Sequence, residues 1–94
     1  MQFLVVAHDG ADDGAAARRR AAREAHMEGA KAMTASGAMI CGGALLDDGG
    51  AMIGSACMVE FEDRAALDAW LEGDPYVTGD VWRTIEVTPF HRAV

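Results

Sequence analysis

The chain has 94 residues, and its 8 lysines and arginines stand against 15 aspartates and glutamates for a formal net charge of -7. This acidity argues against a nucleic-acid partner, because phosphate backbones are bound by cationic surfaces. No apolar run approaches the roughly 20 residues of a membrane span, and the apolar start lacks the basic lead-in of a signal peptide. We therefore expect a cytoplasmic protein with one domain over residues 1–94, without a membrane or nucleic-acid partner.

The first half of the chain predicts a strand, a long helix and a second strand. Residues 2–7 form a short apolar run typical of a strand. Residues 15–36 are rich in alanine and contain no proline, which favours a helix, and Gly37 stands where helices commonly end. Residues 39–46 are again apolar and predict the second strand.

The second half predicts two more strands with a helix between them. The Asp-Asp-Gly-Gly sequence at residues 47–50 indicates a hairpin turn into a third strand over residues 52–61. Asp63 can cap a helix over residues 64–72, whose apolar residues recur at helical spacing. A fourth strand is expected over residues 81–88.

The resulting order, β-α-β-β-α-β, is that of the ferredoxin-like fold, a four-stranded antiparallel sheet with two helices on one face. The strands are apolar at adjacent positions, such as Phe3 and Leu4 or Met58 and Val59, whose side chains point to opposite faces. The second apolar face also needs a cover, and the chain has no further helix for it. We therefore predict a homodimer packed sheet to sheet.

A histidine lies on the apolar side of the first helix. Ala22, His26, Ala30 and Met33 recur at helical spacing, and Arg23 is one turn from the histidine. An imidazole titrates near neutral pH and can take or give a proton, which makes His26 a candidate for acid–base chemistry. The alternative is a core histidine that satisfies one backbone group.

Asp74 is the second candidate, since it follows the second predicted helix and precedes the stiff Pro75. A carboxylate fixed in this way could orient a histidine and stabilise its charged form. Alternatively, Asp74 caps a short turn that begins at Pro75, because proline suits the first position of a helix. One residue could do both, and we expect a loop or a single turn over residues 76–80.

Further candidates are basic, small or aromatic. Of the clustered Arg18, Arg19, Arg20 and Arg23, Arg19 or Arg23 could bind an anionic substrate, whereas Arg18 and Arg20 are expected to be solvated. Gly42 and Gly43 indicate a bulge, tight packing, or close approach of a ligand. Tyr76 and Trp82 favour core positions, or the walls of a cleft for a planar ligand. Cys41 and Cys57 are expected to be small buried hydrophobes, and no side chains have the spacing of a metal site.

Taken together, these motifs resemble the YCII-related family over nearly the whole chain. The resemblance rests on the order of Arg23-x-x-His26, Gly37, the strand at residues 43–46, the hairpin at residues 47–50, Asp74-Pro75-Tyr76 and the closing residues 87–90. It implies a dimeric α+β barrel and a cleft that holds His26 and Asp74 as an acid–base pair. Met27 and Gly29 replace the family's usual Leu and Tyr, which reshapes one wall of that cleft.

The resemblance implies a small cofactor-independent enzyme, an isomerase or lyase acting on a cyclic, anionic metabolite. His26 would transfer the proton, Asp74 would hold its tautomer, and Arg23, Gly43 and Tyr76 would bind the substrate. The alternative function is a non-catalytic module that binds or senses a small molecule in the same cleft. Neither hypothesis requires a metal or a cofactor.

Overall fold

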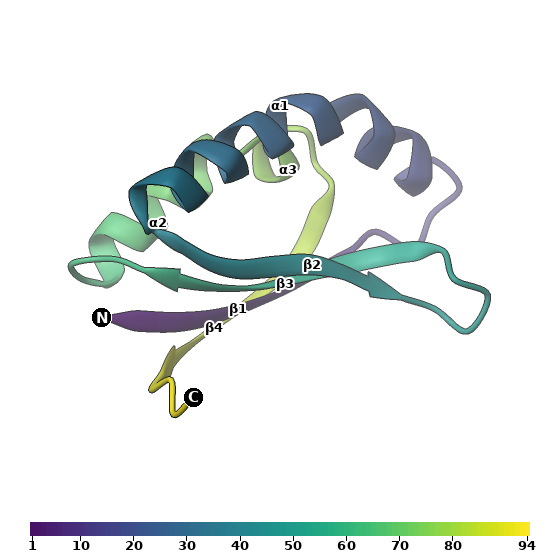
Figure 1. Ribbon diagram of the computed structural model, residues 1–94. Helices are drawn as coiled ribbons and strands as arrows, with labels where there is room; N and C mark the ends of the chain where they lie inside the picture. Colours follow the sequence, from purple (N-terminus) through teal and green to yellow (C-terminus); the bar gives the residue numbers. More distant parts are fainter.

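A computed structural model describes all of residues 1–94 as one layer of helices over one sheet (Figure 1). The sheet contains β1 (Gln2–Asp9), β2 (Met39–Leu46), β3 (Met52–Glu60) and β4 (Trp82–Phe90) in the order β2-β3-β1-β4, with every pairing antiparallel. The predicted ferredoxin-like order and fold class are confirmed.

The helices follow from local signals that the sequence carries. Helix α1 (Ala15–Ser36) ends at Gly37, whose φ of 89° lies in the left-handed region that glycine adopts without strain. Helix α2 (Arg64–Gly73) begins after Asp63, whose carboxylate accepts a hydrogen bond from the Ala66 amide at 2.8 Å. Both of these predicted helix boundaries are confirmed.

The segment expected as a loop or a single turn contains a third helix, α3 (Pro75–Thr78). The last strand also continues through Phe90 instead of ending at Thr88. A proline is tolerated there because β4 is an edge strand, so Pro89 removes no donor that a central ladder would need. None of the helices combines the length and apolar character needed to cross a membrane.

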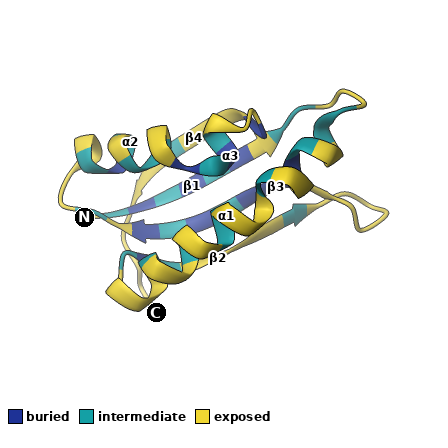
Figure 2. Ribbon diagram, turned by 90° about the horizontal axis from the view of Figure 1, so that it is seen from above, coloured by how far each residue is buried: buried dark blue, intermediate teal, exposed yellow.

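All three helices lie on one face of the sheet, and the buried residues concentrate on the central strands beneath them (Figure 2). One core cluster, which includes Phe3, Val59 and Leu67, lies under α2. A second cluster joins β1 to α3 and the start of β4, and it consists of Ala7, Tyr76, Val81 and Trp82. The aromatic members of this second cluster, Tyr76 and Trp82, line the cavity described below.

The opposite face of the sheet carries no helix (Figure 1). The pairing of β1 with β3 places Leu4 opposite Met58 and Val6 opposite Ala56 on this face, since Phe3 and Val5 alternate toward the core. These four side chains are only partly buried. We call them the open face; the sheet therefore does have the two apolar faces expected from its sequence.

The two cysteines lie on opposite faces of the sheet. Cys57 is buried on the helix side, whereas Cys41 is exposed. The expectation that both are buried is wrong for Cys41, because β2 is an edge strand and this position points away from α1.

Arg18 connects the start of α1 to the loop before β4. Its guanidinium donates to both carboxylate oxygens of Asp12, at 2.8 and 2.6 Å, and to the Asp80 carbonyl oxygen at 3.0 Å. The hydrogen bonds from Arg18 hold the pKa of the Asp12 carboxyl well below its usual range, and the pKa of Arg18 is raised by the same pairing. Arg18 is therefore a structural tether and not the freely solvated side chain we expected, whereas Arg20 is exposed.

Candidate functional site

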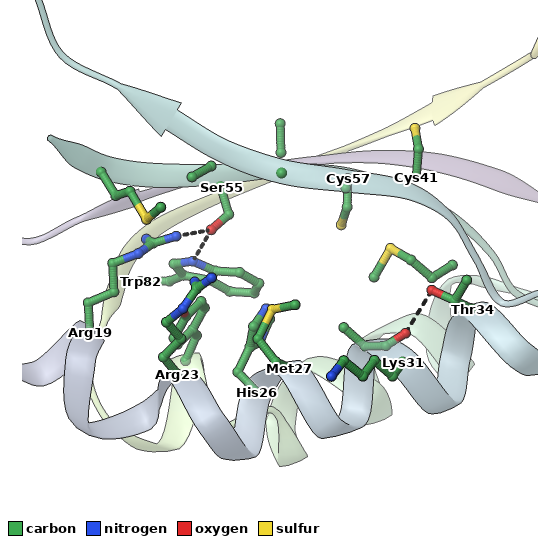
Figure 3. Close-up of a pocket in the computed structure, with 18 of the residues that line it drawn as sticks. Arg19, Arg23, His26, Met27, Lys31, Thr34, Cys41, Ser55, Cys57 and Trp82 are labelled. Carbon is green, nitrogen blue, oxygen red and sulfur yellow. Dashed lines mark hydrogen bonds between the residues drawn. The ribbon is translucent and has the colours of Figure 1, made fainter. Parts of the chain in front are cut away.

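A cavity of about 340 Å³ lies between α1 and the strands β2 and β3 (Figure 3). The residues of α1 that line it include Arg19, Arg23, His26 and Met27, and the aromatic rings of Tyr76 and Trp82 also contribute. This volume falls at the small end of the range for ligand pockets, about 300–1,000 Å³, and suits a single-ring molecule. The lining therefore includes both His26, from α1, and Tyr76, from the segment that follows α2.

His26 lines this cavity and is paired with Asp74, which is not itself one of the lining residues. The Nδ1 atom of His26 lies 2.8 Å from Oδ1 of Asp74, and their side chains are only 12% and 5% exposed. An ionised carboxylate can only accept a hydrogen bond, so it selects the tautomer in which Nδ1 carries the proton. The Nε2 atom then carries the free lone pair of the imidazole, and no protein group forms a hydrogen bond with it.

Asp74 also caps the helix that follows it. The same Oδ1 atom accepts a hydrogen bond from the Tyr76 amide at 2.9 Å, and Pro75 occupies the first turn of α3. Asp74 therefore makes both contacts that the sequence offered as alternatives, the helix cap and the hydrogen bond with a histidine. Because the cap fixes the carboxylate, the imidazole is aimed by a rigid group.

The ring of His26 is also held by its aromatic neighbours. It stacks on Tyr76 with ring centroids 3.8 Å apart and planes 12° apart, and it meets Trp82 edge to face with centroids 5.6 Å apart. Such contacts restrict rotation of the imidazole about its side-chain bonds. Tyr76 therefore borders the cavity through its ring, while its hydroxyl is buried without a hydrogen-bond partner.

Arg19 is buried beside the same cavity, where it forms an ion pair and a hydrogen bond whose partners the sequence did not indicate. Its NH1 atom lies 2.9 Å from both oxygens of Asp9, and its NH2 atom donates to Ser55 Oγ at 3.0 Å. The indole Nε1 of Trp82 donates to the same Ser55 oxygen at 3.1 Å. Asp9 and Ser55 are the functional candidates that sequence reasoning missed, although a lone serine in the apolar run of β3 was a signal.

Two other cations line the cavity and form no ion pair. Arg23 and Lys31 lie on α1 two turns apart, and neither pairs with a carboxylate, unlike Arg18 and Arg19. Unpaired cations beside a pocket of an acidic chain provide a local positive field.

Three glycines on β2 and α1, at positions 42, 43 and 29, differ in how they lie relative to the cavity. Gly43 borders the cavity on β2, but its Cβ position is directed to the open face, like Cys41 two residues earlier (Figure 3). Its neighbour Gly42 faces the cavity, where an added Cβ would lie 3.1 Å from the Cβ of Cys57. A Cβ at Gly29 would meet nothing within 4 Å, so this position on α1 is open.

Cys57 also lines the cavity, but it is not poised as a nucleophile. Burial, assisted by the charge of Asp74, raises the pKa of its thiol to about 12. No group of three or more histidine, cysteine, aspartate or glutamate side chains is placed to hold a metal ion. The titratable group of the cavity with a free lone pair is therefore the imidazole of His26.

These features define an α+β, ferredoxin-like domain with a histidine–carboxylate pair whose histidine lines a cavity between the long helix and the sheet. Residues 1–91 match the YCII-related domain, and the chain belongs to that family, as its motifs predicted. Two relatives called protein YciI, from Escherichia coli O6:H1 and Shigella flexneri, are each 31% identical over 98 residues, which cover 98% of this chain and 98% of the relative.

Among solved structures, the chain is similar to TftG from Burkholderia phenoliruptrix AC1100, described as a 5-chloro-2-hydroxyhydroquinone dehydrochlorinase in complex with 2,5-dihydroxybenzoquinone. The TM-score is 0.87 and the sequence identity 22%, and the match covers 99% of this chain and 96% of TftG. At this identity the likeness establishes a shared fold.

Proposed function

We propose that the protein is a cofactor-independent acid–base enzyme, an isomerase or lyase acting on a small, cyclic, anionic metabolite. The observation that carries this proposal is the 2.8 Å contact between His26 Nδ1 and Asp74 Oδ1 at a cavity wall, which leaves Nε2 as a free base. The fold shared with TftG supports it, since that protein is described as a dehydrochlorinase of a chlorinated hydroquinone.

In the proposed reaction, Nε2 of His26 takes a proton from a hydroxyl or from a carbon next to a carbonyl. Asp74 stabilises the imidazolium that results, and Arg23 offsets negative charge that develops on the substrate. In an elimination, the electrons released by proton removal form a new double bond while the leaving group departs as an anion with its bonding pair. In an isomerisation, the imidazolium returns the proton to another atom of the substrate.

The substrate would lie against the imidazole of His26, which stacks on the buried ring of Tyr76, and beside the backbone of Gly43. The cavity of about 340 Å³ admits a single ring, and the uncommitted charges of Arg23 and Lys31 favour an anion. Met27 lines the cavity where the family usually has Leu, so the preferred ring substituents need not be those of TftG. Gly29 is not among the residues that line the cavity, so the expectation that it reshapes this wall is wrong.

We also propose that two copies pack their open faces together as a homodimer in the cytoplasm. The open face presents Leu4, Val6, Ala56 and Met58 without any helix of the same chain over them. An apolar sheet face is stabilised by removal from water, and a second copy supplies an identical, complementary surface.

The test of the acid–base proposal is turnover of halogenated hydroquinones and lactones by the wild-type protein and by His26→Gln. Loss of the base is expected to lower turnover by about 10²–10⁴-fold, the usual contribution of general acid–base catalysis. His91→Gln, the same substitution at an exposed histidine outside this cavity, is the matched control and should keep the turnover of the wild type.

Equal turnover by wild type and His26→Gln would remove the histidine from the mechanism. Tight binding of panel members without turnover by the wild type would instead establish the alternative, a module that binds or senses a small molecule.

A further inference from the structure

Ser55 occupies an unusual place in the cavity wall. It lies on β3 opposite the core residue Ala7, it is only 8% exposed, and it lines the same cavity as His26. Figure 3 shows its Oγ atom as the meeting point of two hydrogen bonds, one from Arg19 and one from Trp82. The acid–base proposal assigns it no role.

The two hydrogen bonds fix the polarity of the hydroxyl. A serine hydroxyl has two acceptor lone pairs and one hydrogen to donate. Arg19 NH2 and the Trp82 indole can only donate, at 3.0 and 3.1 Å, so they occupy both lone pairs. No protein group accepts the remaining hydrogen of Ser55. The hydroxyl can therefore donate one hydrogen bond to a ligand in the cavity.

The neighbouring charges strengthen this donor and hold it in place. Arg19 is itself anchored by Asp9, whose two oxygens both lie 2.9 Å from NH1, and both side chains are buried. A guanidinium that donates to a hydroxyl draws electron density from it, and hydrogen bonds in such chains reinforce one another at low dielectric. Arg19 and Asp9 are thus positioning residues for Ser55.

The geometry points to Ser55 as the hydrogen-bond donor that binds an anionic oxygen, a phenolate or an enolate, of the ligand in this cavity. The assignment rests on the proposed function, and it adds the oxygen-binding part of the site to the base. Trp82 connects the two parts, because its indole donates to Ser55 while its ring meets the edge of His26. A ring that lies along Trp82 can place one oxygen at Ser55 and present a neighbouring atom to His26.

The probe for this donor is 4-nitrophenol, whose phenolate absorbs visible light while the phenol does not. Binding is measured as a function of pH for the wild type, Ser55→Ala and Ser55→Thr, and the preference for phenolate over phenol is extracted for each protein. Loss of a charge-assisted hydrogen bond is expected to reduce that preference about tenfold in Ser55→Ala. Ser55→Thr keeps a hydroxyl and should keep most of the preference.

An equal or greater preference for phenolate in Ser55→Ala would overturn the assignment, as would failure of the wild type to bind the probe at millimolar concentration. If Ser55→Ala does not fold, a crystal structure of the wild type with 4-nitrophenolate decides. We expect the phenolate oxygen about 3 Å from Ser55 Oγ, and an oxygen bound elsewhere would reject the proposal. The measurement needs no turnover, so a failed catalytic assay would count against the proposed function and leave this binding result standing.

Discussion

The imidazole of His26 and the carboxylate of Asp74 meet through an oxygen, Asp74 Oδ1, that also caps the helix α3. These two residues are 48 positions apart in sequence, and they come together because α1 packs against α3, which begins at the residue after Asp74. The cap gives the carboxylate one fixed orientation, and this orientation determines which nitrogen of the imidazole is left free.

The tautomer of His26 is the first testable consequence. In Asp74→Ala the acceptor for Nδ1 is lost, so we expect the proton to move to Nε2 in a large share of the molecules. Two-bond ¹H–¹⁵N correlation spectra distinguish the two tautomers directly. The variant also loses the cap of α3, which should cost about 1 kcal/mol of unfolding free energy.

Asp68→Ala is the matched control for this measurement, since Asp68 pairs with Arg64 on the exposed side of α2. Its spectra should retain the proton on Nδ1 of His26. An unchanged His26 tautomer in Asp74→Ala would contradict the orienting role of this carboxylate.

The buried pair of Arg19 and Asp9 should be costly to break from one side. Asp9→Asn leaves the guanidinium charge in a buried place, with side chains only 8% and 5% exposed in the intact pair, and should lower the unfolding free energy by about 3 kcal/mol. Asp68→Asn breaks an exposed pair and should cost less than about 1 kcal/mol. Chemical denaturation of both variants gives the comparison, and equal losses would show that Asp9 does not hold a buried charge.

Cys57 should resist thiol reagents at a pH where ordinary cysteines react. The thiolate is the reactive form, and the pKa of Cys57 is raised to about 12, so the thiol stays protonated until the pH approaches that value. In Cys41→Ser the remaining thiol should therefore react with iodoacetamide at pH 8 only after unfolding. Rapid alkylation of the native variant would contradict the burial of this side chain.

The same shift affects stability at high pH. The unfolded chain loses this proton above the ordinary value of 9.0, whereas the folded chain keeps it to about 12. Unfolding then releases a proton, so the contribution of Cys57 to unfolding free energy is constant below pH 9 and falls as the pH rises toward 12. The Cys57→Ser variant should lack this component.

The open face can be tested by placing a charge at its centre. Met58→Lys should convert a dimer into a monomer, because two lysines would be buried against an apolar surface without partners. Ala35→Lys, at an exposed position of α1, should leave the association unchanged. Sedimentation velocity at several concentrations measures both, and a wild type that stays monomeric at micromolar concentration would reject the proposed dimer.

Local patterns were sufficient for much of the fold. The alanine-rich run ended by Gly37, the cap at Asp63 and the turn at residues 47–50 each act over a few residues, so their structures follow from short-range preferences. The continuation of β4 past Pro89 did not follow, because whether a proline ends a strand depends on the strand's place in the sheet.

The candidate site divides in the same way. By itself the sequence determined that His26 faces inward, through the helical spacing of its apolar neighbours, and that Asp74 can cap the turn at Pro75. Only the tertiary structure decided which arginine is buried, since Arg19 takes its partners from Asp9 and Ser55, 10 and 36 residues away. Consecutive arginines on a helix point in directions that differ by about 100°. Which of them forms a buried ion pair therefore depends on which strands lie opposite its side chain.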